Sequence, residues 1–192
     1  TGGPALVESI KDTLTAHNCE AGIFLDLKVY DVSATVVNVL KKYAAVGIDI
    51  LTVSSQCSFK TFLELRQLLP ETKLALVSAL TDVGFEECRA RYGQAPGIKI
   101  FNDCFNICWD YGKNISEKMN PRPFDLVVCS PKELEFLKQN MSEGYGFIVP
   151  GIRDEWMSAD HQKRTTGVAE ALDNGATYVV MGAQLTKGNP EA

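Results

Sequence analysis

Residues 23–31, Ile-Phe-Leu-Asp-Leu-Lys-Val-Tyr-Asp, combine the alternation of a β-strand with charged side chains. Successive side chains of a strand point to opposite faces, so Asp26 and Lys28 are predicted to share one face. Both faces of a parallel sheet are normally covered, and charged side chains there are costly unless they pair or take part in chemistry. We therefore expect a covered Asp26–Lys28 pair near the carboxyl end of a parallel strand, where α/β folds place active sites. The plain structural alternative is an ion pair that orders the end of the sheet.

The residues after this strand alternate between amphipathic stretches and short apolar runs. Over 32–46 the apolar residues recur at helical intervals, and Gly47 is a typical residue to end the helix. The apolar residues at these intervals are Val36, Val39, Leu40 and Tyr43. Strands are predicted at 22–28, 49–54, 73–79, 125–129, 146–149 and 177–182. Further helices are predicted at 5–17, 58–69, 131–140 and 166–174, the third with Ser130 as N-cap and Pro131 at its first position. Residues 84–122 are expected to be less regular, with a loop at 93–97.

Length and composition predict one folded domain, residues 1–192. With 192 residues, 45% of them hydrophobic and 22% charged, the chain has ordinary globular composition. Repeated strand–helix units indicate either a doubly wound sheet or part of a (β/α)8 TIM-type barrel, which usually has about 250 residues. By length alone, this chain is shorter than a whole barrel.

Charge, hydropathy and cysteine usage exclude several classes of partner. The net charge of −5 argues against nucleic-acid binding, and no apolar run is long enough to span a membrane. Six scattered cysteines favour a reduced, cytoplasmic protein. Cys104 and Cys108 are close in sequence, but no second Cys/His pair accompanies them, so no metal site is predicted.

The motif Asp26-Leu27-Lys28-x-x-Asp31, followed by Thr35, resembles the charged signature of the orotidine 5′-monophosphate decarboxylase family. Further segments occur in the family's order over nearly the whole chain: Leu80-Thr81, Val128-Cys129-Ser130, Val149-Pro150-Gly151-Ile152-Arg153, Gln162-Lys163-Arg164 and Tyr178-Val179-Val180-Met181-Gly182. The first motif is shared with sugar-phosphate lyases and synthases of the same superfamily. The Pro-Gly-Ile-Arg and Gln-Lys-Arg segments favour the decarboxylase.

The resemblance implies a (β/α)8 barrel that converts orotidine 5′-monophosphate to uridine 5′-monophosphate in pyrimidine biosynthesis, without a cofactor. Lys28 would donate a proton to the pyrimidine carbon that loses carbon dioxide, a general-acid role. Asp26 would lie near the departing carboxylate, and Asp31 would complete the charged array. Asp31 and Thr35 resemble residues that the family extends into a neighbouring subunit, which implies a homodimer with shared active sites.

The resemblance also implies a set of substrate-binding residues, in which Ser130 and Pro150 contact or border the pyrimidine ring. Arg153 and Thr81 are further substrate contacts, while Gln162 and the backbone at Gly182 belong to the phosphate site. Three of these residues have a plainer alternative: helix capping for Ser130 and Thr81, and an exposed loop side chain for Arg153.

Three departures from the family pattern bear on these expectations. Ala183 stands where the family carries the Arg that binds the phosphate, a charge-assisted contact of about 1.5–3 kcal/mol. The family's first two strands, which supply an Asp for the ribose and a further Lys for the charged array, would precede Thr1, so the barrel is expected to be incomplete at its N-terminus. Residues 54–57, Ser-Ser-Gln-Cys, replace a His-Ala segment, and Gly167-Val168 replaces Thr-Pro.

Two other functions remain open on the sequence. A sugar-phosphate lyase or synthase of the superfamily would use a magnesium ion near Asp26. A barrel impaired in catalysis by Ala183 would serve as a binding or assembly module.

Overall fold

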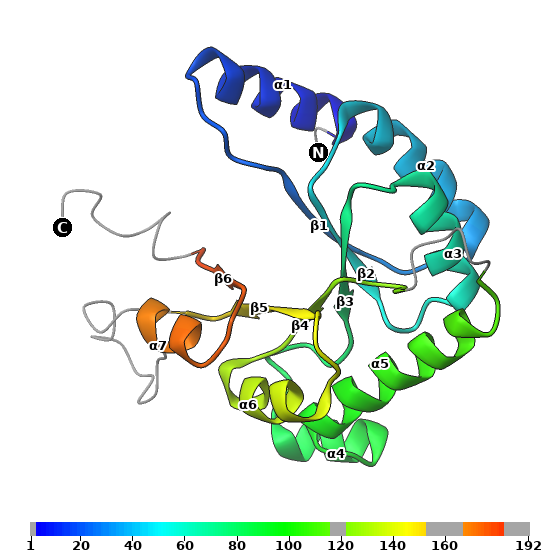
Figure 1. The fold of residues 1–192 in the computed structure, drawn as a ribbon, viewed down its shortest axis with the longest axis vertical. Coiled ribbons are helices and arrows are strands. Elements are labelled where there is room, and N and C mark those ends of the chain that lie inside the picture. The colour runs from blue at the N-terminus through cyan, green and yellow to red at the C-terminus, as the bar shows by residue number, and fades with distance from the viewer. Residues whose placement is uncertain (1–2, 116–121, 153–166, 183–192) are drawn as a thin grey trace. The chain divides into compact units, whose positions relative to one another are not determined.

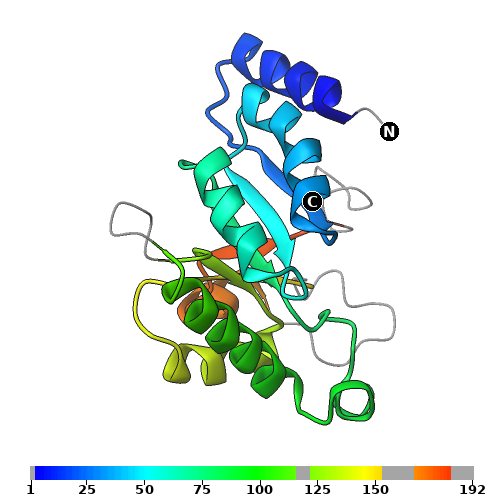
Figure 2. The same ribbon diagram turned by 90° about the vertical axis from the view of Figure 1, so that its right-hand side faces the viewer.

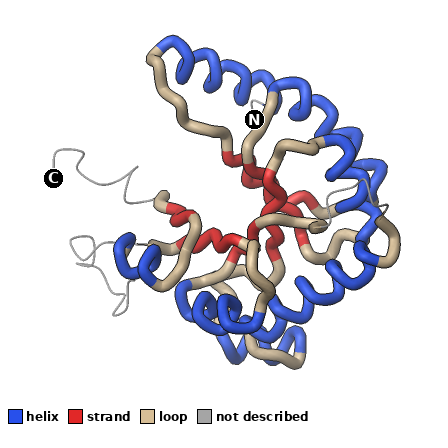
Figure 3. Tube along the Cα trace, in the orientation of Figure 1, coloured by secondary structure: helices blue, strands red, loops and turns tan. Residues whose placement is uncertain are grey.

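The computed structural model describes residues 3–115, 122–152 and 167–182. Its helices are α1 (Gly3–Ala16), α2 (Ser33–Val46), α3 (Phe59–Leu68), α4 (Phe85–Tyr92), α5 (Pro96–Gly112), α6 (Pro131–Asn140) and α7 (Val168–Asp173). Its strands are β1 (Phe24–Val29), β2 (Ile50–Ser54), β3 (Lys73–Val77), β4 (Leu126–Val128), β5 (Gly146–Pro150) and β6 (Tyr178–Val180). Helices and strands alternate along most of the chain (Figures 1 and 3). Each predicted strand is confirmed to within a few residues.

The strands form one six-stranded sheet in the order of the sequence, β1-β2-β3-β4-β5-β6. The pairs β1–β2, β4–β5 and β5–β6 are parallel. Helices lie between successive strands, so the fold belongs to the α/β class. Its strands follow the order that they have in a (β/α) barrel. The chain divides into two compact units: unit 1 holds residues 1–76 and 105–125, and unit 2 holds residues 77–104 and 126–192. The expectation of a single domain stays a prediction.

In unit 1, α2 packs between α1 and α3, and the three helices lie beside the first strands (Figures 1 and 2). Val36, Leu40 and Tyr43 of α2 are buried, and Gly47 ends the helix with a φ of 79°. Val39, which shares the helical spacing of these residues, is 47% exposed. The buried stripe of α2 is thus narrower than the apolar residues of its sequence indicate.

A buried arginine of α3 forms hydrogen bonds with the segment that precedes β4. The guanidinium of Arg66, on α3, donates to the Arg122 carbonyl at 2.9 Å and to the Asp125 carboxylate at 2.8 Å. Asp125 Oδ2 also accepts the backbone N–H of Leu74 at 2.8 Å. A buried charge is tolerated only when it is paired and hydrogen-bonded, as here.

In unit 2, the N-terminus of α6 confirms the predicted Ser130–Pro131 start. Ser130 is the N-cap, and its hydroxyl accepts the N–H of Lys132. Glu133 completes a capping box by accepting the backbone N–H of Ser130 at 3.1 Å. The segment Ser-Pro-Lys-Glu carries this signature in its sequence.

The expectation of an irregular region at 84–122 is wrong for its described part. Helix α4 ends at Gly93, which adopts the left-handed conformation with a φ of 70°. Helix α5 begins only three residues later, at Pro96, the helical position that tolerates a missing N–H. Its buried residues recur at helical intervals: Ile100, Cys104, Ile107 and Tyr111. The loop predicted at 93–97 is therefore confined to residues 93–95.

Within the described ranges, no helix has both the length and the apolar character that crossing a bilayer requires. All six cysteines lie in those ranges as free thiols.

Candidate active site

The charged motif lies on an irregular part of β1 in unit 1. In the pairing of β1 with β2, Leu25 lies opposite Leu51 and Val29 lies opposite Val53, with a register shift between the two pairs. The three β1 residues between these pairs, Asp26 to Lys28, therefore face a single residue of β2, Thr52. This is a β-bulge, a feature that often redirects side chains next to active sites.

A closed set of hydrogen bonds links the bulge to β2. The Lys28 ammonium donates to Asp26 Oδ2 at 2.6 Å, and Thr52 Oγ1 donates to Asp26 Oδ1 at 2.8 Å. The backbone N–H of Lys28 donates to Thr52 Oγ1 at 2.8 Å. Both oxygens of the Asp26 carboxylate are thus occupied, and the backbone of Lys28 is attached to the same hydroxyl.

Lys28 itself has a left-handed backbone, with a φ of 45°. Non-glycine residues rarely adopt this conformation, which costs on the order of 1–3 kcal/mol and is common at functional sites. The conformation accompanies the hydrogen bond from the Lys28 N–H to a side chain of β2. A strained lysine in a bulge, paired with a carboxylate, is typical of a side chain held for chemistry.

The prediction that sheet neighbours cover the Asp26–Lys28 pair is wrong. The two side chains are 46% and 47% exposed, respectively. The physical reason is the place of β1 in the sheet, since among the described strands it is the first in the hydrogen-bonded order and pairs with β2 alone. An ion pair this exposed contributes about 0–1 kcal/mol, so the pair adds little to folding.

Asp31 and Thr35 follow β1 at the start of α2, and both are exposed. Asp31 Oδ1 accepts the backbone N–H of Val32 at 2.7 Å, which shapes the turn into the helix. Cys57 packs beneath this turn, with its thiol 3.4 Å from the Val29 carbonyl. Burial is the main cause that raises the pKa of the Cys57 thiol, and it outweighs the lowering effect of a hydrogen bond with the Asp31 backbone.

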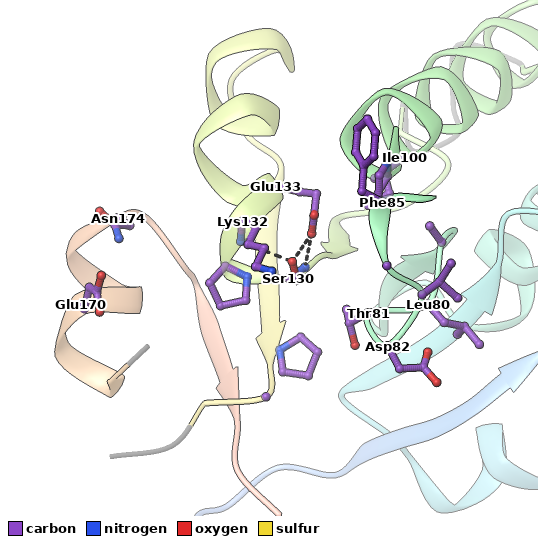
Figure 4. A pocket seen from close by; sticks show the side chains of 17 residues that line it. Leu80, Thr81, Asp82, Phe85, Ile100, Ser130, Lys132, Glu133, Glu170 and Asn174 are labelled. Carbon is purple, nitrogen blue, oxygen red and sulfur yellow. Dashed lines mark hydrogen bonds between the residues drawn. The ribbon is translucent and has the colours of Figure 1, made fainter. Parts of the chain in front are cut away.

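Unit 2 contains a cavity of about 890 Å³ that brings together three predicted substrate-binding residues, Thr81, Ser130 and Pro150. Figure 4 shows Ser130 at the start of α6, facing Thr81 and Leu80 of the loop after β3. The apolar part of its lining comes mainly from rings and branched side chains: Leu80, Val83, Phe85, Pro96, Ile100, Pro131 and Pro150. A lining that combines apolar side chains with a few polar groups is typical of small-molecule sites.

Ser130 contributes a hydroxyl to the lining of this cavity. It donates to the Glu133 carboxylate while it caps α6 (Figure 4). The second lone pair of the hydroxyl can still accept from a ligand. Capping and ligand binding are therefore compatible roles for this residue.

The charged residues of the cavity lining are mostly acidic. Asp82, Glu133 and Glu170 contribute carboxylates, whereas Lys132 is the single cation among the described lining residues. Burial is the main cause that raises the pKa of Cys129 to about 12, and the negative charge of Glu133 is the second cause. This part of the cavity suits neutral groups that carry hydrogen-bond donors, and a phosphate needs cations from elsewhere.

The remaining predicted contacts divide between described and undescribed residues. Gly182 follows β6, is exposed, and is not among the described residues that line the cavity. Arg153, Gln162 and Ala183 lie outside the described residues, as do the neighbours Lys163 and Arg164.

Two residues of these sites were not predicted from the sequence. Thr52 is a polar residue within an apolar strand, Ile-Leu-Thr-Val, and this break in the pattern is the signal that could have identified it. Glu133 is found by the Ser-x-x-Glu capping-box spacing from Ser130. The part of the chain that the structure describes contains no group of three His, Cys, Asp or Glu side chains able to hold a metal ion.

Comparison with known proteins gives the class of this fold and site. Residues 2–192 match the model of the orotidine 5′-phosphate decarboxylase / HUMPS family. The orotidine 5′-phosphate decarboxylase of Desulfosudis oleivorans is 30% identical over all of this chain and 74% of its own length. That of Nostoc sp. is 26% identical, over 97% of this chain and 75% of its own length.

The fold agrees with a solved structure as well. The orotidine 5′-phosphate decarboxylase of Lactobacillus acidophilus matches with a TM-score of 0.64 and 24% identity, over 94% of this chain and 74% of that one. The chain belongs to the orotidine 5′-phosphate decarboxylase / HUMPS family.

Proposed function

We propose that this chain decarboxylates orotidine 5′-monophosphate to uridine 5′-monophosphate in pyrimidine biosynthesis. The observation that carries the proposal is the Asp26–Lys28 pair, 2.6 Å apart on the β1 bulge, within a chain of this family. Relatives that share 26–30% of its residues carry the name of this carboxy-lyase. No cofactor takes part in the proposed reaction.

Lys28 is the proton donor of the proposed reaction, and its side chain is held by the Asp26 carboxylate. The bond between the pyrimidine ring and the carboxylate breaks, carbon dioxide leaves, and the electron pair stays on the ring carbon. The Lys28 ammonium stabilises that developing charge and transfers a proton to the carbon. The neutral amine then regains a proton from solvent.

Asp26 has two tasks in this proposal. Through its hydrogen bond with Lys28, Oδ2 keeps the ammonium beside the reacting carbon. The same negative charge repels the substrate carboxylate, a repulsion that disappears as carbon dioxide departs. Asp31 completes the charged array.

The cavity of unit 2 is the proposed site for the pyrimidine and ribose. Ser130 would bind the ring through its hydroxyl, and Pro150 would border it, while Thr81 supplies a further contact. The acidic lining suits ribose hydroxyls, which donate hydrogen bonds, better than it suits a phosphate. We assign the phosphate to Arg153, Gln162 and the backbone of Gly182, with Ala183 in place of the family's arginine.

We further propose a homodimer in which Asp31 and Thr35 reach the neighbouring subunit's site. Both residues are exposed, as this role requires. Mixing Lys28→Ala protein with Asp31→Asn protein tests it, because shared sites restore activity in mixed dimers. Equal inactivity before and after mixing, in a chain shown to be dimeric, would refute shared sites.

The barrel and the cellular location are also proposals. We propose that β1–β6 form part of a (β/α)8 barrel, because their order follows the sequence. Six free thiols support a reduced, cytoplasmic setting.

Release of carbon dioxide from carboxyl-labelled orotidine 5′-monophosphate tests the proposed activity. The native chain is expected to release label at the same rate before and after chelation with EDTA. Turnover that EDTA abolishes would instead favour the magnesium-dependent sugar-phosphate lyase or synthase, a possibility that the shared Asp-x-Lys-x-x-Asp motif keeps open. No release and no binding of uridine 5′-monophosphate by calorimetry would indicate a barrel without turnover.

A further inference from the structure

Thr52 is a buried polar residue in a strand that is otherwise apolar up to its last position. Its side chain belongs to β2, whose first four residues are all buried, and only 1% of the residue is exposed. Its hydroxyl contacts two residues of the charged motif, donating to Asp26 Oδ1 and accepting from the N–H of Lys28, each at 2.8 Å. The other buried threonine next to this strand, Thr72, donates instead to the backbone carbonyl of Ile48. Thr52 is therefore bonded to the proposed chemistry, whereas Thr72 is bonded to the scaffold.

The bulge makes this arrangement possible. Because three residues of β1 lie opposite Thr52 alone, the N–H of Lys28 is available to a side chain of β2. The left-handed backbone of Lys28 occurs at the same point. Between the paired positions, β1 has three residues where β2 has one. Because the difference is an even number, Asp26, Lys28 and Thr52 stay on the same face of the sheet.

The hydroxyl of Thr52 uses its single proton on Asp26 and one lone pair on Lys28. The Lys28 ammonium completes this hydrogen-bond network by donating to the other oxygen of Asp26. Since β-branched side chains have a restricted χ1 angle, and β2 is buried, the direction of the hydroxyl is fixed by the scaffold. By contrast, Asp26 and Lys28 are about half exposed, and their own packing does not hold them.

We propose that Thr52 is a positioning residue that sets the direction of both Asp26 and Lys28 from the buried strand β2. This inference rests on the proposed function of Lys28 as proton donor. Thr52 does not touch the substrate in this account, and it acts through the carboxylate and the backbone that it holds. Small misplacements of reacting groups cost large factors in rate, on the order of 100-fold for about 1 Å.

The test compares Thr52→Val, which removes the hydroxyl and keeps the shape, with Thr52→Ser, which keeps the hydroxyl. Thr72→Val is the matched control, because it removes a buried hydroxyl of the same unit that donates to the Ile48 carbonyl. We expect Thr52→Val to lower kcat for orotidine 5′-monophosphate by roughly 10- to 100-fold with KM within about twofold. Thr52→Ser and Thr72→Val are expected to keep kcat near the native value.

A second readout does not depend on activity. Amide hydrogen exchange at Lys28, followed by NMR, is expected to quicken in Thr52→Val and to stay slow in Thr52→Ser and Thr72→Val. If Thr52→Val does not fold, comparison of Thr52→Ala with Thr52→Ser isolates the hydroxyl in its place.

The outcomes separate the positioning role from the proposed function. Native kcat in a folded Thr52→Val protein, or unchanged exchange at Lys28, overturns the positioning role. Equal losses of kcat in Thr52→Val and Thr72→Val overturn it too, because they indicate a general structural effect. If the native chain releases no carbon dioxide, the proposed function fails, and the exchange at Lys28 alone decides whether Thr52 holds the bulge.

Discussion

The β1 bulge of unit 1 and the cavity of unit 2 use opposite structural means to present polar groups. In the bulge, a strained lysine and an exposed carboxylate are held by a residue of the next strand, 26 positions from Asp26 in the sequence. In the cavity, Ser130 is held by a regular capping box within three residues of itself. The bulge is thus held by contacts between residues far apart in the sequence, whereas Ser130 at the cavity is held by residues close to it in the sequence.

This difference matches the chemistry proposed for each region. A proton donor must be held at a defined position, and strain at Lys28 is acceptable where the surrounding strands impose it. A binding residue needs only a stable orientation, which a helix N-terminus provides at no cost in strain. Changes in the bulge should therefore alter kcat, and changes at the cavity should alter binding and stability.

The largest effect is expected for Lys28→Ala. Removal of the proposed proton donor should lower kcat by about 10²- to 10⁴-fold. Steady-state assay with orotidine 5′-monophosphate measures the change. Lys41→Ala, which removes an exposed lysine of α2, is the matched control and should retain native kcat. A kcat as high for Lys28→Ala as for Lys41→Ala would refute the assignment.

Ala183→Arg is expected to strengthen the binding of the phosphorylated ligand. A restored arginine adds a charge-assisted hydrogen bond of about 1.5–3 kcal/mol, which corresponds to roughly 10- to 100-fold tighter binding of uridine 5′-monophosphate. Calorimetry with the nucleotide and with uridine measures both affinities. Equal gains for the two ligands would contradict a phosphate contact at this position.

A smaller effect is expected for Ser130→Ala. Loss of the N-cap should lower the free energy of unfolding by about 1 kcal/mol, because an N–H at the start of α6 loses its acceptor. Urea denaturation measures this loss, and Ser130→Thr, which keeps a capping hydroxyl, is the control. Unchanged stability in Ser130→Ala would show that the capping box contributes nothing to unit 2.

The smallest effect concerns cysteine reactivity. Burial and the Glu133 charge raise the pKa of Cys129 from 9.0 to about 12, so its reactive thiolate is scarce at pH 8. Alkylation followed by mass spectrometry should label exposed Cys19 and leave Cys129 unlabelled. Because the folded state holds the Cys129 proton more tightly, its contribution to stability is present below pH 9 and is lost as pH rises toward 12. Rapid labelling of Cys129 in the folded chain at pH 8 would contradict this protection.

The sequence predicted the strands well because most of them are short apolar runs between turn residues, while β1 is marked by its alternating side chains. Ser130 and Pro131 likewise marked the start of α6 by local chemistry alone. The two helices within 84–122 were missed, since Gly93 and Pro96 indicate a loop and the loop between α4 and α5 is only three residues long.

The site was harder to predict than the fold. Asp26 and Lys28 were identified as a pair, but their exposure depends on the position of β1 in the sheet, which periodicity does not reveal. Thr52 was missed because its role requires the register of two strands and a bulge between them. Arg153, Gln162 and Ala183 came from family resemblance, and their roles stay predictions.

The central claim is that Lys28 protonates the ring carbon that loses carbon dioxide, and turnover in D₂O tests it most directly. The account predicts that the native chain forms uridine 5′-monophosphate with deuterium at that carbon, observed by NMR, and that Lys28→Ala forms almost none in the same time. Formation of deuterated product by Lys28→Ala at the native rate would contradict the claim.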